Sequence, residues 1–199
     1  MRAAATPKGT RRRARLIAAA GELLLEGGFD AVRHRAVADR AQLPLASTTY
    51  YFASLEDLVV EAVAYNCRGD QDAIAERAHA LPRRRRGCET TAEALAEVFV
   101  GERTTRDRLT CRYEAIVLCA RVPRLHQVLV DHRNSLRNIH FEVLEKSGRN
   151  TDPTGIEQLM AVEDGVVIGA LADSVDDLVK VTRVALCEVI DQLAPVTSA

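Results

Sequence analysis

The chain has 199 residues, of which 47% are hydrophobic, and a formal net charge of −1. This length allows a substantial core, and the composition excludes a disordered or fibrous chain. Five cysteines, with no CxxC pair and an odd count, argue against a disulfide-stabilised secreted domain. The basic N-terminus is not followed by a long apolar segment with a cleavage site, and no apolar run approaches the ~20 residues that span a bilayer. We therefore expect a cytoplasmic protein with no membrane span.

The charge is unevenly divided along the chain. Residues 1–52 carry nine Lys and Arg against four acidic residues, whereas the rest carries 18 against 24. A basic N-terminal part on an acidic remainder is typical of a protein that presents one end to phosphate. The alternative is a solvated basic helix without a partner.

The first helix is expected after a flexible arm of residues 1–9. Thr10 can cap this helix, which continues to about Glu26 and ends at Gly27-Gly28. Its buried face is predicted from apolar residues at the helical spacing i, i+3, i+7, namely Ile17, Ala20 and Leu24.

Residues 33–60 are the most informative stretch. His34–Ala41 has the apolar spacing of a short helix, and Gln42-Leu43-Pro44 interrupts it, because Pro44 has no N–H to donate. Leu45–Phe52 is then short and rich in hydroxyl groups, which makes a poor core element but a good contact surface. A helix, a tight turn and a short polar helix form the helix-turn-helix pattern, whose second helix enters the DNA major groove.

Further helices fill the rest of the chain, so the predicted fold class is all-α. Ser54, with Asp57 three residues later, forms a capping box that begins a helix to about Ala78, before Leu81-Pro82. Further helices are expected at about 90–101, 106–121, 123–147, 153–173 and 175–193. Ser174 marks a tight last turn.

The basic run Arg83–Arg86 is expected to be a solvated loop. A contribution to DNA affinity, which would show in the salt dependence, and a partner contact are the alternatives.

The last two helices are strongly apolar on more than one side, which indicates burial on both flanks. Ala161, Gly165 and Gly169 stand at i, i+4 and i+8, and such a stripe lets helix backbones approach closely. Either a crossing within the chain or a seam between two copies would explain it. The predicted dimer interface consists of Ala161, Gly165, Gly169, Val181, Ala185 and Val189.

No catalytic constellation is present, so we expect no enzyme, no cofactor and no metal. GxSxG, HExxH and a phosphate-cradling glycine loop are all missing. The helical offsets of His126, His132 and His140 do not place all three on one face. Glu163-Asp164 is expected to face solvent or the rim of a dimer.

Most cysteines are expected to be small buried hydrophobes, with a redox sensor as the alternative. Only Cys88 has a basic cluster nearby.

The chain resembles the tetracycline-repressor (TetR) family over roughly residues 10–65. The resemblance rests on Ile17–Val32, Val37–Ala41, Ser47–Phe52 and Ser54–Leu58, which match the first, second, recognition and fourth helices of the family. It implies an all-α homodimer with a DNA-binding domain (1–53) and a ligand-binding and dimerisation domain (54–199). The implied function is a sequence-specific regulator, a repressor released from a palindromic double-stranded DNA operator by a small-molecule effector.

Four positions depart from the family pattern. Gln42 stands where Gly is common, Leu55 where Lys is common, Arg33 where Thr is common, and Thr49 where Tyr is common. Two other classes of function therefore stay open. One is a helical ligand-binding protein with weak or lost DNA binding, and the other is a small all-α enzyme.

The resemblance also implies site residues. Arg35 is expected to read a base, and a bidentate donor suits guanine. Three residues are expected to face the groove floor: Leu45, Ala46 and Thr49. Phosphate contacts are expected from Arg33, His34, Ser47, Thr48, Tyr50 and Tyr51.

An effector pocket is expected in the C-terminal helices, mostly apolar with a few orienting polar groups. The candidate lining residues, each of which could also be ordinary core, are Val63, Asn66, Cys67, Phe99, Tyr113, Ile116, Val117 and Cys119. A moderately apolar metabolite is preferred, because the low aromatic content of 4% disfavours a large aromatic cage.

Overall fold

The computed structural model describes residues 6–101 and 104–197. These residues fold into helices, so the all-α prediction is confirmed. The described residues also contain one isolated β-bridge, between Arg149 and Val196. They pack as two compact units. The first unit comprises the described residues up to Gly69 together with Thr110–Val130, and the second comprises Asp70–Leu109 with the described residues from Asp131 onward.

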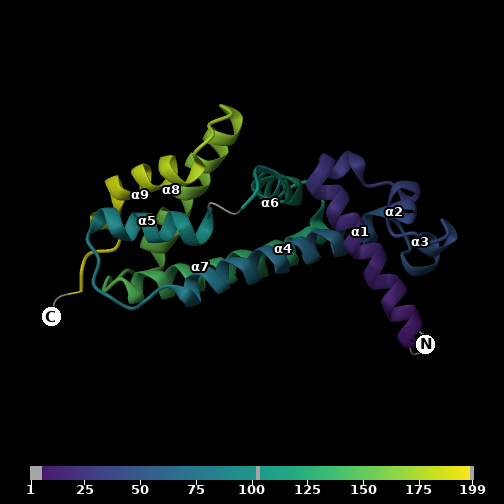
Figure 1. Cartoon of the computed structure of the whole chain (residues 1–199), viewed down its shortest axis with the longest axis horizontal. Coiled ribbons are helices and arrows are strands. Elements are labelled where there is room, and N and C mark those ends of the chain that lie inside the picture. The colour runs from purple at the N-terminus through teal and green to yellow at the C-terminus, as the bar shows by residue number, and fades with distance from the viewer. Residues whose placement is uncertain (1–5, 102–103, 198–199) are drawn as a thin grey trace. The chain divides into compact units, whose positions relative to one another are not determined.

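The helices follow one another with short connections (Figure 1). In chain order they are α1 (Pro7–Ala31), α2 (His34–Arg40), α3 (Ala46–Tyr51), α4 (Leu55–Ala80), α5 (Cys88–Phe99), α6 (Arg106–Cys119), a short 3₁₀ helix η1 (Pro123–Leu125), α7 (His126–Lys146), α8 (Pro153–Ala172) and α9 (Leu178–Leu193). Among the described residues, every helix is too short or too polar to cross a lipid bilayer.

Helix α1 begins earlier than the sequence suggested. Thr6, not Thr10, is the N-cap, and its Oγ1 accepts a hydrogen bond from Gly9 N at 3.2 Å. Pro7 occupies the first turn, where its missing N–H costs nothing. The expected arm of residues 1–9 is therefore wrong from Thr6 onward, and residues 1–5 lie outside the described residues.

The glycine pair interrupts α1 as predicted. Gly28 has φ 64° and ψ −162°, a conformation that only glycine adopts readily. A Cβ at this position would lie 3.2 Å from a carboxylate oxygen of Glu114. The chain thus changes direction here before α2.

The core of the first unit combines α1, α2, the first part of α4 and α6. Its fully buried side chains include Leu16, Leu24, Leu58 and Leu125. Burying a leucine stabilises the fold by about 1.5–3 kcal/mol relative to exposure, so this core fixes the position of α2 and α3.

The second unit is built from α5, α8, α9 and parts of α4 and α7. The largest buried side chains in its core include Phe99, Leu95, Ile156, Leu159 and Leu186. Helices α5 and α9 pack against each other, and α8 packs against α9.

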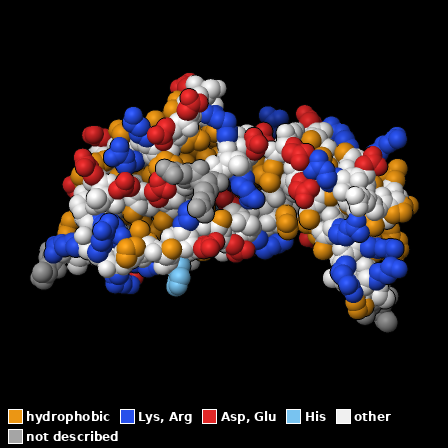
Figure 2. All heavy atoms as spheres, viewed as in Figure 1, with side chains coloured by type: hydrophobic (Ala, Val, Ile, Leu, Met, Phe, Trp, Pro, Cys, Tyr) orange, Lys and Arg blue, Asp and Glu red, His pale blue; other side chains and the backbone are white. Residues whose placement is uncertain are grey.

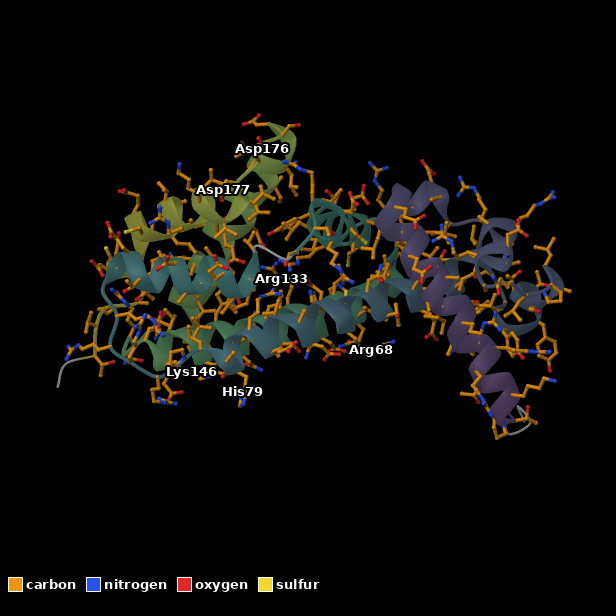
Figure 3. The ribbon with its side chains drawn as sticks, viewed as in Figure 1. Arg68, His79, Arg133, Lys146, Asp176 and Asp177 are labelled. Atoms are coloured by element: carbon orange, nitrogen blue, oxygen red, sulfur yellow. The ribbon has the colours of Figure 1, made fainter. Side chains whose placement is uncertain are left out.

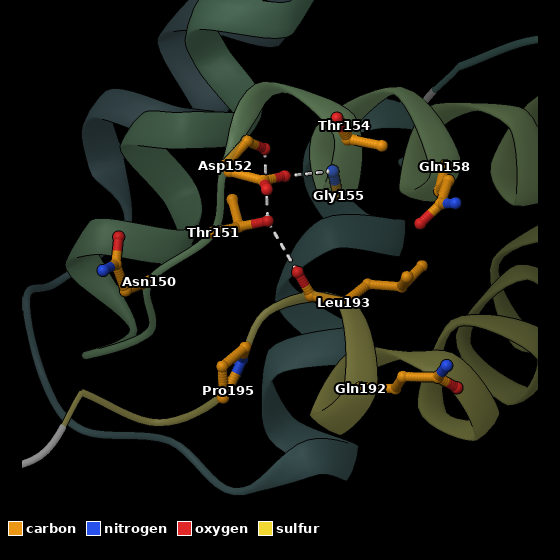
Figure 4. A pocket seen from close by; sticks show the side chains of 9 residues that line it. All are labelled: Asn150, Thr151, Asp152, Thr154, Gly155, Gln158, Gln192, Leu193 and Pro195. Carbon is orange, nitrogen blue, oxygen red and sulfur yellow. Dashed lines mark hydrogen bonds between the residues drawn. The ribbon is translucent and has the colours of Figure 1, made fainter.

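The start of α8 and the end of α9 meet at a polar hollow of about 490 Å³ (Figure 4). Asp152 caps α8 through Gly155 N at 2.7 Å, and Thr151 Oγ1 donates to Leu193 O at 2.6 Å. A Cβ on Gly155 would lie 2.6 Å from Leu193 O, so only glycine allows this approach.

Helix α9 begins at Leu178, capped by Asp177, rather than at the predicted residue 175. Ser174 forms the expected tight turn with φ 56°.

The run Arg83–Arg86 is not a wholly solvated loop. Arg86 is 4% exposed and donates to Pro82 O at 2.8 Å and Lys146 O at 3.2 Å. Its backbone N–H bonds Ser147 O. Burial, with a contribution from Arg84, lowers the pKa of Arg86. Arg83 pairs with Glu145 at 3.1 Å. The segment is therefore fastened to the end of α7, and the expectation for Arg86 was wrong.

The two compact units do not coincide with the predicted domains 1–53 and 54–199, which remain a prediction about function. Helix α4 contributes its first part to one unit and its last part to the other, and Thr110–Val130 packs with the N-terminal helices. Sequence order alone does not reveal this return of the chain.

Candidate functional site

Helices α2 and α3 with their turn form a compact helix-turn-helix in the first unit. Leu43 N donates to Ala38 O at 3.0 Å, which closes the turn after α2. Gln42 has φ 52° and so adopts the left-handed conformation that favours glycine. The departure from the family pattern at Gln42 therefore leaves the turn itself in place.

Helix α3 presents one face inward and one outward. Thr48 is fully buried, and its Oγ1 donates to Leu45 O at 2.8 Å. The expected phosphate contact of Thr48 is therefore wrong, because the hydroxyl points into the helix-turn-helix core. By contrast, Tyr50 is 80% exposed and Leu45 52% exposed. The remaining predicted residues of α3 are exposed or half-buried: Ala46, Ser47, Thr49 and Tyr51.

Three arginines of the basic N-terminal part have structural partners, which the sequence reading did not assign. Arg40 forms ion pairs with Glu26 at 2.6 Å and Glu22 at 3.2 Å. Arg15 donates to Ala41 O, the C-cap of α2. Arg13 pairs with Glu61 and lies over the Phe52 ring at 5.1 Å. The sequence carries little sign of the Arg40 pairs, because Glu26 and Glu22 lie 14 and 18 residues before Arg40. Helical spacing rules apply only to residues three or four positions apart.

The three predicted contact residues at the start of α2 differ in their surroundings. Arg35 is exposed on α2, whereas the exposed Arg33 lies 3.4 Å from Asp30. His34 is half-buried, with Nδ1 enclosed and without a hydrogen-bond partner in the described part of the chain. In Figure 2, Lys and Arg side chains gather over the part of the first unit that contains α1.

A hollow of about 440 Å³ lies between the start of α1 and α3. It brings four of the predicted residues of α3 together with Lys8 and Arg12 of α1, two basic residues that the predicted site did not include. The lining residues are Thr6, Lys8, Gly9, Arg12, Ala46, Ser47, Tyr50 and Tyr51. Hydroxyl groups and cations around one hollow suit the oxygen atoms of a phosphate.

The predicted effector residues are divided between the two units of the described chain. Val63 and Tyr113 are buried, and four others are packed with the first unit's core: Cys67, Ile116, Cys119 and, through hydrogen bonds, Asn66. Asn66 Nδ2 donates to Gly21 O at 3.0 Å and ties α4 to α1. Val117 is 67% exposed on α6, and its place in the effector pocket stays a prediction. Phe99 belongs to the second unit.

Phe99 lies in a buried polar cluster of the second unit. Its ring stacks on His140 with centroids 3.6 Å apart and planes 17° apart. His140 Nδ1 donates to Leu136 O at 2.9 Å, and Nε2 lies 3.3 Å from Glu163 Oε2. Glu163 is 5% exposed, so the expectation that it faces solvent was wrong. Asp164 pairs with Arg133 at 2.9 Å.

The small-residue stripe of α8 lies on an open face of this chain. Ala161, Gly165 and Gly169 are exposed, and a Cβ on either glycine would meet nothing within 4 Å. A helix crossing within the described chain therefore does not explain the stripe. Exposed Ile168 (47%) and Val184 (52%) extend its apolar character to α9. Val181, Ala185 and Val189 are half-buried on α9.

The histidines of α7 do not converge. Among the described residues, no group of three His, Cys, Asp or Glu side chains could hold a metal ion. His132 Nε2 lies 3.6 Å from a carboxylate oxygen of Asp70 on α4.

Comparison with known proteins agrees with this geometry. The multidrug binding protein EbrR, in crystal structures with proflavin and with ethidium, is 28% and 29% identical to this chain, with TM-scores of 0.69 and 0.71. These matches cover 89% and 93% of this chain and 98% and 99% of EbrR. SCO1917, a TetR-family member from Streptomyces coelicolor A3, is 29% identical with a TM-score of 0.70, over 93% of this chain and 99% of its own. No protein of curated function matches the chain in sequence.

Family models match both parts of the chain. The model for bacterial regulatory proteins of the tetR family matches residues 16–62, which contain α2 and α3. The model for tetracyclin repressor-like C-terminal domains matches residues 86–192, more than half of the chain. The chain therefore belongs to the tetracycline-repressor (TetR) family of transcriptional regulators.

Proposed function

We propose that this protein is a homodimeric repressor that leaves a palindromic operator when a small-molecule effector binds. The observation that carries the proposal is the face of the helix-turn-helix. Tyr50 of α3 and Leu45, the N-cap residue of α3, are exposed although both are large and apolar enough to be buried. A surface of this kind, beside the exposed basic residues Arg35, Lys8 and Arg12, suits the major groove and its phosphates. Such a regulator acts in the cytoplasm, on the DNA.

The proposed DNA surface combines base-reading and positioning residues. Arg35 is assigned to guanine, and Leu45, Ala46 and Thr49 to the groove floor. Phosphate contacts are assigned to Arg33, His34, Ser47, Tyr50, Tyr51, Lys8 and Arg12. Lys8 and Arg12 are included because they share the hollow of α3.

The dimer is proposed to form through the exposed face of α8 with α9. Ala161, Gly165 and Gly169 leave room for a second helix to approach closely, and Ile168 and Val184 would lose their exposure to water. Two copies place two recognition helices on one operator, so the half-sites should be related by twofold symmetry.

For the effector we propose a small, largely apolar organic molecule bound in the C-terminal helices. The buried carboxylate of Glu163, beside Phe99 and His140, favours an effector with one positive charge. The EbrR complexes hold proflavin and ethidium, which are aromatic cations. Release of DNA requires the effector to prefer the dimer form that does not fit the operator.

The test begins with selection of bound fragments from random DNA at one fixed salt concentration, followed by footprinting. We expect a twofold-symmetric site. A thermal-shift screen of metabolites and organic cations, followed by operator-release assays, then identifies effectors. Glu163→Gln should weaken the binding of a cationic effector.

Two results would contradict the proposal. Binding of no DNA fragment, with effector binding intact, would show the alternative of a ligand-binding protein that has lost DNA binding. A selected site without twofold symmetry would contradict the dimeric arrangement.

A further inference from the structure

The second unit contains two cysteines whose sulfur atoms lie side by side. Cys88 is the first residue of α5 and Cys187 lies in α9, 99 residues later, and the two Sγ atoms are 3.2 Å apart. Both thiols are free in this structure. The other cysteines, Cys67, Cys111 and Cys119, belong to the first unit.

The surroundings hold this pair together. Helices α5 and α9 pack along each other, and both cysteines lie against the hydrophobic core of the second unit. Formation of a bond therefore needs only a small movement of side chains, because the backbones are already apposed. Both residues are half-buried, so a small oxidant can reach them.

The two sulfurs have different surroundings. The bond to Cys88 and burial raise the pKa of Cys187 to about 11. Cys88 is the first residue of α5, and the N-terminus of a helix favours a negative charge. We therefore assign the role of the nucleophile to Cys88.

We propose that Cys88 and Cys187 are a site of reversible oxidation, at which a hydroperoxide converts the two thiols into an intramolecular disulfide between α5 and α9. The Cys88 thiolate attacks one peroxide oxygen and the O–O bond breaks, which yields a sulfenic acid and, after protonation, water. The Cys187 sulfur then attacks the sulfenic sulfur, the S–S bond forms, and hydroxide leaves with the Cys187 proton as water. The dithiol loses two electrons and two protons, and hydrogen peroxide becomes two water molecules.

The experiment uses the full-length, fully reduced protein treated with hydrogen peroxide. Remaining thiols are alkylated after denaturation, counted by intact mass, and located by peptide mapping. We expect the number of free thiols to fall from five to three, with a peptide pair joining Cys88 to Cys187. Dithiothreitol should restore all five, and non-reducing electrophoresis should show no covalent dimer.

Matched variants separate this pair from general thiol oxidation. Neither Cys88→Ser nor Cys187→Ser should form an internal disulfide under the same treatment, whereas Cys119→Ser should fall from four free thiols to two. Circular dichroism checks that each variant is folded, and Cys88→Ala serves if the serine variant is not. If peptide mapping of the treated wild type finds both Cys88 and Cys187 alkylated, and so still reduced, the proposal is overturned without any variant. A disulfide from either of them to another cysteine, or to another chain, also overturns it.

A second readout follows from the length of the closed loop. A disulfide across 99 residues removes much conformational freedom from the unfolded chain. Oxidation of the wild type should raise its Tm by roughly 5 °C or more, and should leave the Tm of Cys187→Ser unchanged. An equal shift in both proteins would show that the stabilisation does not come from this bond.

Discussion

Arg35 and Arg40 lie on the same short helix but have different surroundings. Arg40 is held by two glutamates of α1, whereas Arg35 projects from α2 into solvent. Residue type and spacing alone could not distinguish them, because the partners of Arg40 come from a different helix. The ion pairs of Arg40 therefore serve stability, whereas the DNA contact of Arg35 is a proposal.

Replacing Arg35 tests this assignment. Arg35→Ala should weaken binding to a footprinted operator by about 1–3 kcal/mol and relax the sequence preference at one base pair. Arg68→Ala is the control, since Arg68 is an exposed arginine in the middle of α4 (Figure 3). Both affinities are measured at the same salt concentration. Equal affinities of the Arg35 variant and the wild type would refute the base contact.

Replacing Arg40 should instead change the pH dependence of stability. Its hydrogen bonds hold the pKa of Glu26 below the usual value of 4.5. The ionised glutamate therefore contributes stability above pH 4.5, and this contribution is lost as the pH falls through the lower folded-state pKa. Arg40→Gln should have a lower Tm than the wild type at pH 7, and the difference should shrink below about pH 4. Tm values measured from pH 3 to 8 check this, with Arg68→Gln as the control. A difference that stays constant over this range would rule out the linkage.

At the scale of the elements, the sequence predicted which helices exist more reliably than where they end. The helix-turn-helix and the six later helices follow from apolar spacing and capping residues, which act locally. Helix α1 shows the limit, because Thr6 and Thr10 are both acceptable caps and Pro7 in the first turn decides for Thr6. Burial of Thr48 and Arg86 was missed for another reason. A hydroxyl or a guanidinium enters a core only when carbonyl oxygens surround it, and those come from folding.

The break in α1 provides a test at this scale. Gly28→Ala should destabilise the protein by about 1–3 kcal/mol, because alanine rarely adopts φ 64° with ψ −162°. Gly69→Ala is a matched control in α4, where a Cβ meets nothing within 4 Å, and it should stabilise by about 0.5–1 kcal/mol. Chemical denaturation measures both. Destabilisation of equal size in both variants would contradict the conformational explanation.

At the scale of the whole molecule, the open face of α8 predicts the state of association. Gly165→Leu adds a side chain where this chain has free space, so helix content and fold should be retained. In a dimer joined through this face the same side chain would block the approach of the second copy. We expect sedimentation to show a dimer for the wild type and a monomer for the variant, with operator affinity lost. Gly69→Leu, also in open space, is the control. A dimeric Gly165→Leu protein would place the interface elsewhere.

The path of α4 limits how this regulator can be divided and recombined. Leu58, Ala62 and Val63 of α4 are buried in the first unit, together with Cys111 and Ala115 of α6. A chimera joined at residue 53 would therefore separate the helix-turn-helix from the residues of α4 and α6 that complete its hydrophobic core. Exchange of operator specificity between relatives requires transfer of residues up to Gly69 together with Thr110–Val130. Within this family, operator specificity should therefore change more readily by replacement of individual contact residues than by exchange of the whole N-terminal segment.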